Sequence, residues 1–255
     1  MDGVTTRLRF LGVAGYEISG PRGRLVIDPY LTGNPAAPLR PGELPVPDLL
    51  LVTHGAFDHL GDTAGIALGT GAPVVCGGDV RALLLDRGVP SEQVRATVWG
   101  VAVEVAGLVV HPVESRHWSF SQLGDGTVLS GPPLGYVVET EPGVVLYHTG
   151  DSALFGDMGL IGQLHRPTVG LLGCAQPRAL LPGLPGPGRV VSGEMTPRAA
   201  ALAAGLLGVG LAVASHYLDP ADPDVAEFRA LVPGAVAPRP GQTLVMDGDH
   251  SYLEE

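Results

Sequence analysis

Histidine and aspartate residues gather in one short segment of the chain. Residues 48–62, DLLLVTHGAFDHLGD, run from an apolar stretch into His54, Asp58 and His59 within six positions. Neutral imidazole and carboxylate groups are ligands that Zn²⁺, Mn²⁺ and Fe²⁺ accept. In the middle of this cluster, where a further donor is expected, stands Ala56. The spacing alone is a weak signal, because such a pattern also arises by chance in polar loops.

Further polar side chains follow other apolar stretches. His117 comes two residues after VVHPVES (109–115), Asp151 follows VVLYHTG (144–150), and His216 follows LAVAS (211–215). Loops that leave the same end of a sheet converge on one crevice in layered α/β architectures. A lone histidine after a strand is more often a cap or a core residue. The combination, with each residue at a strand end, instead favours a shared site.

Strands and helices must position these side chains, and the apolar patterns predict both. Strands are expected at 6–12, 16–19, 24–30, 49–52, 74–76, within 97–115, on both sides of the turn 141–143, and at 169–173, 211–215 and, last, 242–247. Helices are expected at 61–69, 79–88, 152–164, from Thr196-Pro197 onwards, and at 222–232. The segments SRHWSF (115–120) and 182–193 are predicted to be loops. We therefore expect one domain over residues 1–255, with sheets inside and helices outside.

The composition excludes several classes of protein. Hydrophobic residues make up 45% and charged residues 16%, which opposes disorder. No apolar run has the roughly 18–20 residues that a membrane span needs. The net charge is −11, and the fifteen basic residues, all arginine, form no cluster, so nucleic acid is not an expected partner. Two cysteines and no signal peptide predict a cytoplasmic protein.

Several segments together resemble the metallo-β-lactamase fold superfamily. Within it, the chain is similar to the small single-domain metal-dependent hydrolases related to the ascorbate-6-phosphate lactonases. The resemblance covers about residues 7 to 247 and is carried by RFLGVAGYEI, RLVIDPYLTGNP, THGAFDHLGD (against THxHxDHxGD), SRHWS, YHTGDS, GEMTPRAAA and ASHY. It implies a mixed α/β (α+β) protein, folded as a four-layer αββα sandwich.

The resemblance also implies two adjacent metal positions. The first metal position would be held by His54 and His117, with Ala56 where the family has its second histidine. The second metal position would be held by Asp58, His59 and His216. Asp151 would bridge the two positions. In the family, a bridging water or hydroxide is the nucleophile.

Ala56 weakens the first position, because its side chain offers no donor atom. A catalytic zinc site typically has three protein ligands and one open position. The sequence therefore allows one ion, or two with unequal affinity, with zinc expected and manganese or iron acceptable. Four residues are candidates to replace the missing ligand: His111, Glu114, Cys174 and Glu194.

The expected activity is hydrolysis of a small molecule, such as a lactone, another cyclic ester or amide, or a phosphoester. Asp58 could orient the attacking water as a general base. A non-hydrolytic metal enzyme and a metal-binding relic without catalysis are the alternatives. Arg116, Trp118 and Arg178 are candidates for substrate contacts, although ordinary loop residues are commoner. Proteins that resemble this one are often homo-oligomers, so a homo-oligomer is one of the expected states.

Two other polar residues are interpreted as structural. Asp28 lies in the IDP turn (27–29), where its carboxylate can accept hydrogen bonds from backbone amides. His148 lies three residues before Asp151, and alternation along the strand puts it and Tyr147 on opposite faces. We expect His148 to be a buried core or supporting residue.

Overall fold

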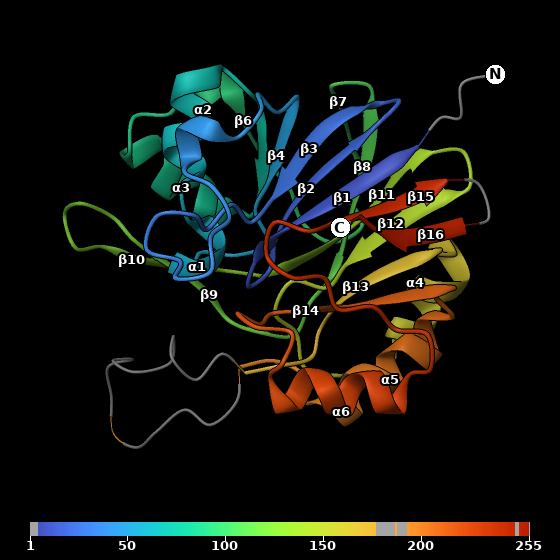
Figure 1. The fold of residues 1–255 in the computed structure, drawn as a ribbon. Helices are drawn as coiled ribbons and strands as arrows, with labels where there is room; N and C mark the ends of the chain where they lie inside the picture. The colour runs from blue at the N-terminus through green and yellow to red at the C-terminus, as the bar shows by residue number, and fades with distance from the viewer. Residues whose placement is uncertain (1–4, 177–186, 188–192, 248–249, 255) are drawn as a thin grey trace.

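Two β-sheets lie face to face, and helices cover their outer sides (Figure 1). The computed structural model describes residues 5–176, 187, 193–247 and 250–254. The first sheet has the order β16-β15-β1-β2-β3-β4-β5-β6 and the second β14-β13-β12-β11-β8-β7. The four-layer αββα prediction is confirmed.

The strands of the first sheet are β1 (Thr6–Gly12), β2 (Gly15–Gly20), β3 (Gly23–Ile27), β4 (Leu49–Leu51), β5 (Val74–Cys76), β6 (Val94–Ala96), β15 (Thr243–Asp247) and β16 (His250–Leu253). Those of the second are β7 (Val103–Val105), β8 (Leu108–Glu114), β11 (Leu134–Glu141), β12 (Val144–His148), β13 (Val169–Gly173) and β14 (Leu211–Ser215). A separate hairpin is formed by β9 (Ser119–Gln122) and β10 (Val128–Gly131).

The helices are α1 (Phe57–Leu60), α2 (Thr63–Thr70), α3 (Gly78–Asp86), α4 (Met158–His165), α5 (Pro197–Leu207) and α6 (Pro223–Leu231), with single 3₁₀ turns at Pro41–Glu43 and Ser91–Gln93. Helices α2 and α3 cover the first sheet, and α4, α5 and α6 cover the second (Figure 1). Thr196 caps α5 as predicted, because its side chain accepts a hydrogen bond from the amide of Ala199. Within the described residues, no helix has the length and apolarity that crossing a membrane requires.

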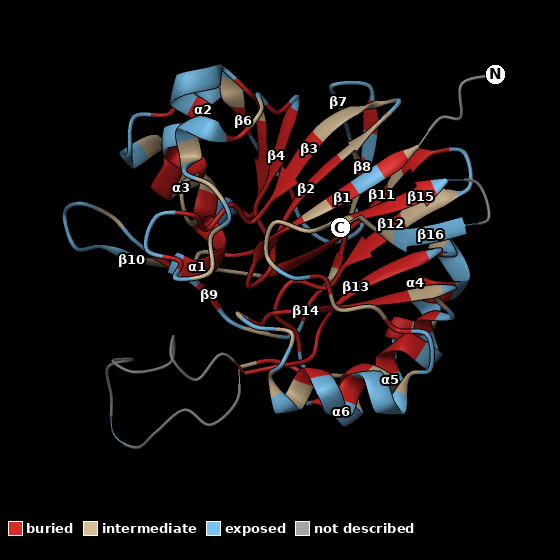
Figure 2. Cartoon of the chain, in the orientation of Figure 1, coloured by how far each residue is buried: buried red, intermediate tan, exposed pale blue. Residues whose placement is uncertain are grey.

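The apolar run at 49–52 is explained by the two cores on either side of β4. Leu49 and Leu51 belong to the core between the sheets, whereas Leu50 and Val52 belong to the core under α2 and α3. Alternate side chains of a strand point to opposite faces, so a strand buried on both faces is apolar throughout. Figure 2 shows that β4 and the other central strands are largely buried, whereas the edge strand β16 and the outer sides of the helices are exposed.

Three of the expected elements differ in the structure. The helix expected at 152–164 begins only at Met158, because the preceding residues pair with another loop: the amide of Ala153 donates to the carbonyl of Arg116. The segment SRHWSF is not wholly a loop, since β9 starts at Ser119. The last strand is β16, which pairs antiparallel with β15. Most of the loop expected at 182–193 lies outside the described residues.

The strands are arranged so that their ends meet at one edge of the sandwich. β3 to β6 run parallel in the first sheet, and β12 to β14 run parallel in the second. The turn after β12 passes very close to the turn after β4: a Cβ on Gly150 would lie 2.9 Å from the Cβ of Thr53. Gly150 also has a φ of 56°, which favours glycine. The loops that carry His54 and Asp151 are thereby brought together.

Candidate metal centre

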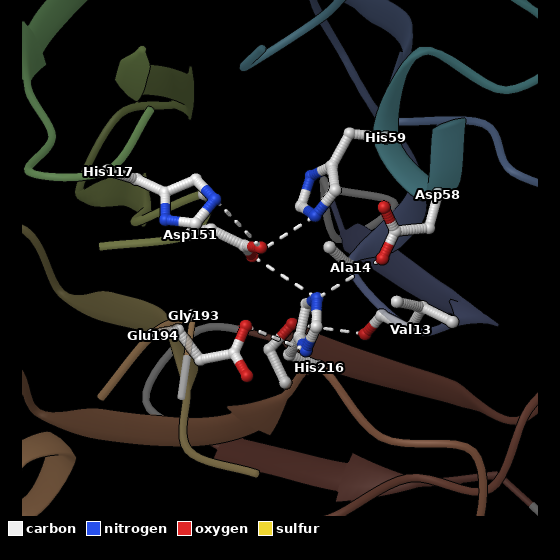
Figure 3. Close-up of polar contacts among 12 residues, drawn as sticks. Val13, Ala14, Asp58, His59, His117, Asp151, Gly193, Glu194 and His216 are labelled. Atoms are coloured by element: carbon white, nitrogen blue, oxygen red, sulfur yellow. Dashed lines mark hydrogen bonds and ion pairs between the residues drawn. The ribbon is translucent and has the colours of Figure 1, made fainter. Parts of the chain in front are cut away.

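All six residues expected to hold metal lie together at this edge of the sandwich. The loops after β4, β8, β12 and β14 and the short helix α1 supply them, and Figure 3 shows Asp58, His59, His117, Asp151 and His216 pointing toward one another. Ser115 and Ser152 hold two of the loops in place, because the Ser115 hydroxyl donates to the carbonyl of Asp151 and the Arg116 amide donates to the Ser152 hydroxyl. The six side chains are His54, Asp58, His59, His117, Asp151 and His216.

The residues expected at the second metal position form a tight group. The Nε2 atom of His59 lies 3.1 Å from Oδ1 of Asp151, and Nε2 of His216 lies 3.3 Å from the same oxygen. Oδ2 of Asp58 lies 3.6 Å from Nε2 of His216. Single donor atoms of Asp58, His59 and His216 all fall within 4.8 Å of one another, which is a spacing that one ion can bridge.

The residues expected at the first metal position are more loosely placed. His54 groups with His59 and Asp151, whose donor atoms lie within 4.8 Å of one another. His117 stands further out, with Nε2 at 3.9 Å from Oδ2 of Asp151. Ala56 lines the cavity in front of these groups and contributes only a methyl group.

Two buried carboxylates stand behind the histidines of the second position. Nδ1 of His59 is hydrogen-bonded to Asp28 at 2.7 Å. Nδ1 of His216 lies 2.9 Å from Glu194 and is also hydrogen-bonded to the carbonyl of Ala175 at 3.3 Å. A partner on Nδ1 fixes the ring and directs Nε2 towards the centre, as it does in many metal sites.

Asp28 is thus more than the turn residue that the sequence predicts. It accepts hydrogen bonds from the amide and hydroxyl of Thr53 at 2.8 and 2.7 Å, as expected for a structural aspartate. It also contacts His59, which no pattern near either residue indicates. Asp28 and His216 both have a positive φ, 48° and 65°, and backbone strain of this kind is concentrated at functional sites.

The electrostatics of the cluster are those of a cation site. Burial opposes ionisation of Asp151, but the imidazoles of His216 and His59 hold its pKa well below its usual range. Burial also opposes protonation of His216, yet Asp151 and Glu194 raise its pKa well above the ordinary value. Burial lowers the pKa of His54 to about 3, so this imidazole stays neutral and free to act as a ligand.

The donor atoms fit a metal ion because protein groups do not satisfy them. Nε2 of His54, His59 and His216 and Oδ1 of Asp151 are buried, and within the described part of the chain none of them has a partner in hydrogen-bond geometry, although His59 and His216 lie close to Asp151. Buried polar atoms are nearly always paired, and leaving one unpaired costs about 1–3 kcal/mol. These atoms belong to overlapping groups of possible ligands that share Asp151 and His59, and bound cations would satisfy them.

The candidate replacements for the missing ligand are mostly elsewhere. His111 packs against His165, Glu114 pairs with Arg116, and the thiol of Cys174 points at the carbonyl of Ser215. Glu194 alone of the four reaches the cluster, but beside His216 rather than beside Ala56. It forms a possible ligand group with Asp151 and His216. No described residue among the four fills the place that Ala56 leaves.

The three residues expected to contact substrate lie in different places. Trp118 lines the cavity, as expected. Arg116 does not, since its guanidinium pairs with Glu114 at 2.9 Å and lies over the ring of Phe155. Arg178 lies outside the described residues. His148 is a buried structural residue as predicted: its Nδ1 accepts from the amide of Gly150, and Nε2 is hydrogen-bonded to the carbonyl of Ala14.

A cavity of about 430 Å³ opens directly over the cluster. Its floor holds the imidazole and carboxylate groups, and its walls come from α1, α3 and the β9–β10 hairpin. A volume of this size suits a small molecule.

The fold and this donor set define the class of protein, and comparison with known proteins agrees. Residues 23–217 match the family described as "Beta-lactamase superfamily domain". The chain is 39% identical over 214 residues to a UPF0173 metal-dependent hydrolase of Rubrobacter xylanophilus, covering 83% of this chain and 81% of that one. It is 38% identical to a protein of the same name from Methanopyrus kandleri, covering 88% and 90%. The chain belongs to the UPF0173 metal-dependent hydrolase family of the metallo-β-lactamase superfamily.

Solved structures show the same fold. Igni18, a metallo hydrolase from Ignicoccus hospitalis, is 25% identical with a TM-score of 0.74, covering 95% of this chain and 99% of that one. The isothiocyanate hydrolase from Delia radicum gut bacteria is 20% identical with a TM-score of 0.69, covering 94% and 99%. At that identity the second likeness concerns the fold alone.

Proposed function

We propose that this chain hydrolyses a small molecule, namely a lactone, another cyclic ester or amide, or a phosphoester. The reaction would depend on one principal divalent ion held by Asp58, His59, Asp151 and His216. The observation that carries the proposal is the set of buried, unpaired donor atoms at the base of an open cavity. The names of the relatives, metal-dependent hydrolases, support it.

The ion, when bound, polarises the carbonyl or phosphoryl oxygen and lowers the pKa of a water molecule to about 7. The protein would supply the remaining chemistry. Asp58 lines the cavity and can hold the attacking water by a hydrogen bond. The water oxygen bonds to the acyl carbon or the phosphorus while its proton passes to Asp58. The bond to the leaving oxygen or nitrogen breaks, and the leaving group takes up that proton.

The donor types favour zinc without requiring it. Imidazole nitrogens suit Zn²⁺, whereas the carboxylates of Asp58 and Asp151 also suit Mn²⁺ and Fe²⁺. A second ion at the first position would have only His54, His117 and a share of Asp151. We therefore expect it to bind more weakly.

Metal removal and restoration test the proposal. The purified chain is assayed against a simple lactone, an amide and a phosphoester, then again after dialysis against a chelator and after return of Zn²⁺ or Mn²⁺. We expect turnover of one of these substrate classes. This turnover should disappear with the chelator and return with metal. His165→Ala serves as a control, because this histidine lies away from the cluster beside His111. Turnover that is indifferent to metal, or absent for every class with metal bound, would overturn the proposal.

A further inference from the structure

Three aromatic side chains in the wall of the cavity are only half covered by the protein. Phe57 is 56% exposed, Trp118 50% and Phe120 44%, and all three line the same cavity. The rings of Trp118 and Phe120 meet edge to face, with centroids 5.8 Å apart. Exposed aromatic surface that faces a concave site is typical of ligand binding.

Strand alternation explains why two of these rings share a face. In β9, Ser119 and Ser121 are buried while Phe120 and Gln122 are exposed. Trp118 lies just before the strand and two residues from Phe120, so its side chain is on the same face. Trp118, Phe120 and Gln122 therefore all face the cavity. Trp118 and Phe120 thus give this wall most of its surface, which is apolar, and Gln122 lies at its end.

The wall is fixed relative to the metal cluster. The Ser119 hydroxyl donates to Asp79 of α3 at 2.5 Å and accepts from the amide of Gly55 at 3.0 Å. The strand passes so close to the loop after His54 that a Cβ on Gly55 would lie 2.6 Å from the carbonyl oxygen of Phe120. Glycine is required at 55 for this approach. A ligand that contacts the wall is therefore held at a set place relative to the imidazoles.

The polar groups of the cavity are concentrated on its floor. Apart from the cluster and Glu194, the polar side-chain groups among the described lining residues are those of Arg87 and Gln122 and the indole N–H of Trp118. The rest of the lining is apolar or glycine, including Leu60 and Leu83. A phosphorylated or many-hydroxylated molecule needs several donors and acceptors to replace its hydration. This wall favours a molecule with one polar end.

We propose that the substrate carries an apolar, planar group that lies against Phe57, Trp118 and Phe120, while its hydrolysable ester, lactone or amide group reaches the metal cluster. The substrate class rests on the proposed function. The preference of the wall for a planar apolar group is a binding property, however, and can be measured without turnover.

The test compares two inert carboxylates that differ by one ring. Binding of 4-phenylbutyrate and of butyrate to the purified chain, with its metal content measured, is followed by isothermal titration calorimetry. Coverage of the aromatic wall by the phenyl ring is expected to tighten binding between about tenfold and a hundredfold. In the double variant Trp118→Ala, Phe120→Ala the preference should fall to less than about threefold, because most of the apolar contact area is lost. Tyr252→Ala is the matched control, since this aromatic side chain is also 52% exposed but lies on β16, outside the cavity.

A Trp118→Leu, Phe120→Leu variant separates loss of the aromatic wall from loss of folding. It keeps apolar side chains at both positions and should retain part of the preference for phenylbutyrate. Equal binding of the two carboxylates by the unaltered chain would overturn the inference. So would a preference that survives in the alanine double variant or is lost equally in Tyr252→Ala. If phenylbutyrate is preferred but no ester, lactone or amide is turned over, the proposed function fails and the apolar binding wall stands.

Discussion

The two expected metal positions share one cluster but differ in how their ligands are supported. At the second position, His59 and His216 each have a buried carboxylate beside Nδ1, from Asp28 and Glu194. At the first, the partner of Nδ1 of His54 among the described residues is the Thr53 hydroxyl, at 3.1 Å. A carboxylate partner fixes the orientation of the imidazole ring and raises its basicity as a metal ligand. A hydroxyl partner raises that basicity less.

The difference suggests that an incomplete first position would leave the second position intact. Ala56 offers no donor atom on the side of His54, where His117 and Asp151 also lie further apart, at 3.9 Å. The groups around Asp151, His59 and His216 remain within contact distance of one another. We infer that the second position has kept its binding capacity, and the following changes measure how unequal the two positions are.

The largest effect is expected from removing one ligand of each position in turn. His216→Ala takes a donor from the second position and should lower both metal content and hydrolysis to background. His54→Ala should keep the principal ion and reduce activity by only about tenfold, the size of effect typical of supporting residues. Metal per chain by elemental analysis and turnover are measured on both variants. Equal losses would show that the two positions work as an obligatory pair.

A smaller effect is expected at the carboxylate behind His59. Asp28→Asn keeps the size of the side chain but removes the charge beside Nδ1, so metal affinity should fall about 10- to 100-fold. Competition with a fluorescent zinc chelator measures the affinity. Because Asp28 also holds Thr53, the thermal midpoint is recorded alongside. A lower thermal midpoint with unchanged metal affinity would mean that Asp28 stabilises the turn and does not support the metal ligand His59.

A still smaller effect is expected at Glu194. Glu194→Ala removes the carboxylate 2.9 Å from Nδ1 of His216, but the carbonyl of Ala175 still accepts from that nitrogen. We expect metal affinity to fall about tenfold, at the low end for such partners. Glu194→Gln retains an acceptor oxygen and should recover part of the loss. If Gln behaves like Ala, the charge rather than the hydrogen-bonding position of Glu194 matters.

That the six candidate ligands lie together could be predicted from the sequence, because strand ends converge. His54 and His216 follow apolar strands directly, and a layered α/β fold brings such ends together. The fold itself was predictable for a similar reason: β4 is apolar at every position because it separates two cores. Such patterns are local, so one chain is enough to read them.

The supporting contacts could not be predicted, since they depend on the tertiary structure. Asp28 and His59 are 31 residues apart, and nothing local to either residue signals their hydrogen bond. Glu194 was one of several candidates, and only the structure places it beside His216. The β9 strand is not predictable in the same way, because its four residues give too little periodicity even though Ser119 and Phe120 alternate in burial.

The number of ions per chain, measured by elemental analysis for the unaltered protein and for Ala56→His after the same zinc loading, tests the central claim most directly. Histidine at 56 would restore an imidazole to the first position and leave the second untouched. The unequal-position account predicts about one tightly held ion in the unaltered chain, as expected for one intact ligand set, and a clear rise towards two in Ala56→His. Two tightly held ions without the substitution, or no retained ion in either protein, would contradict it.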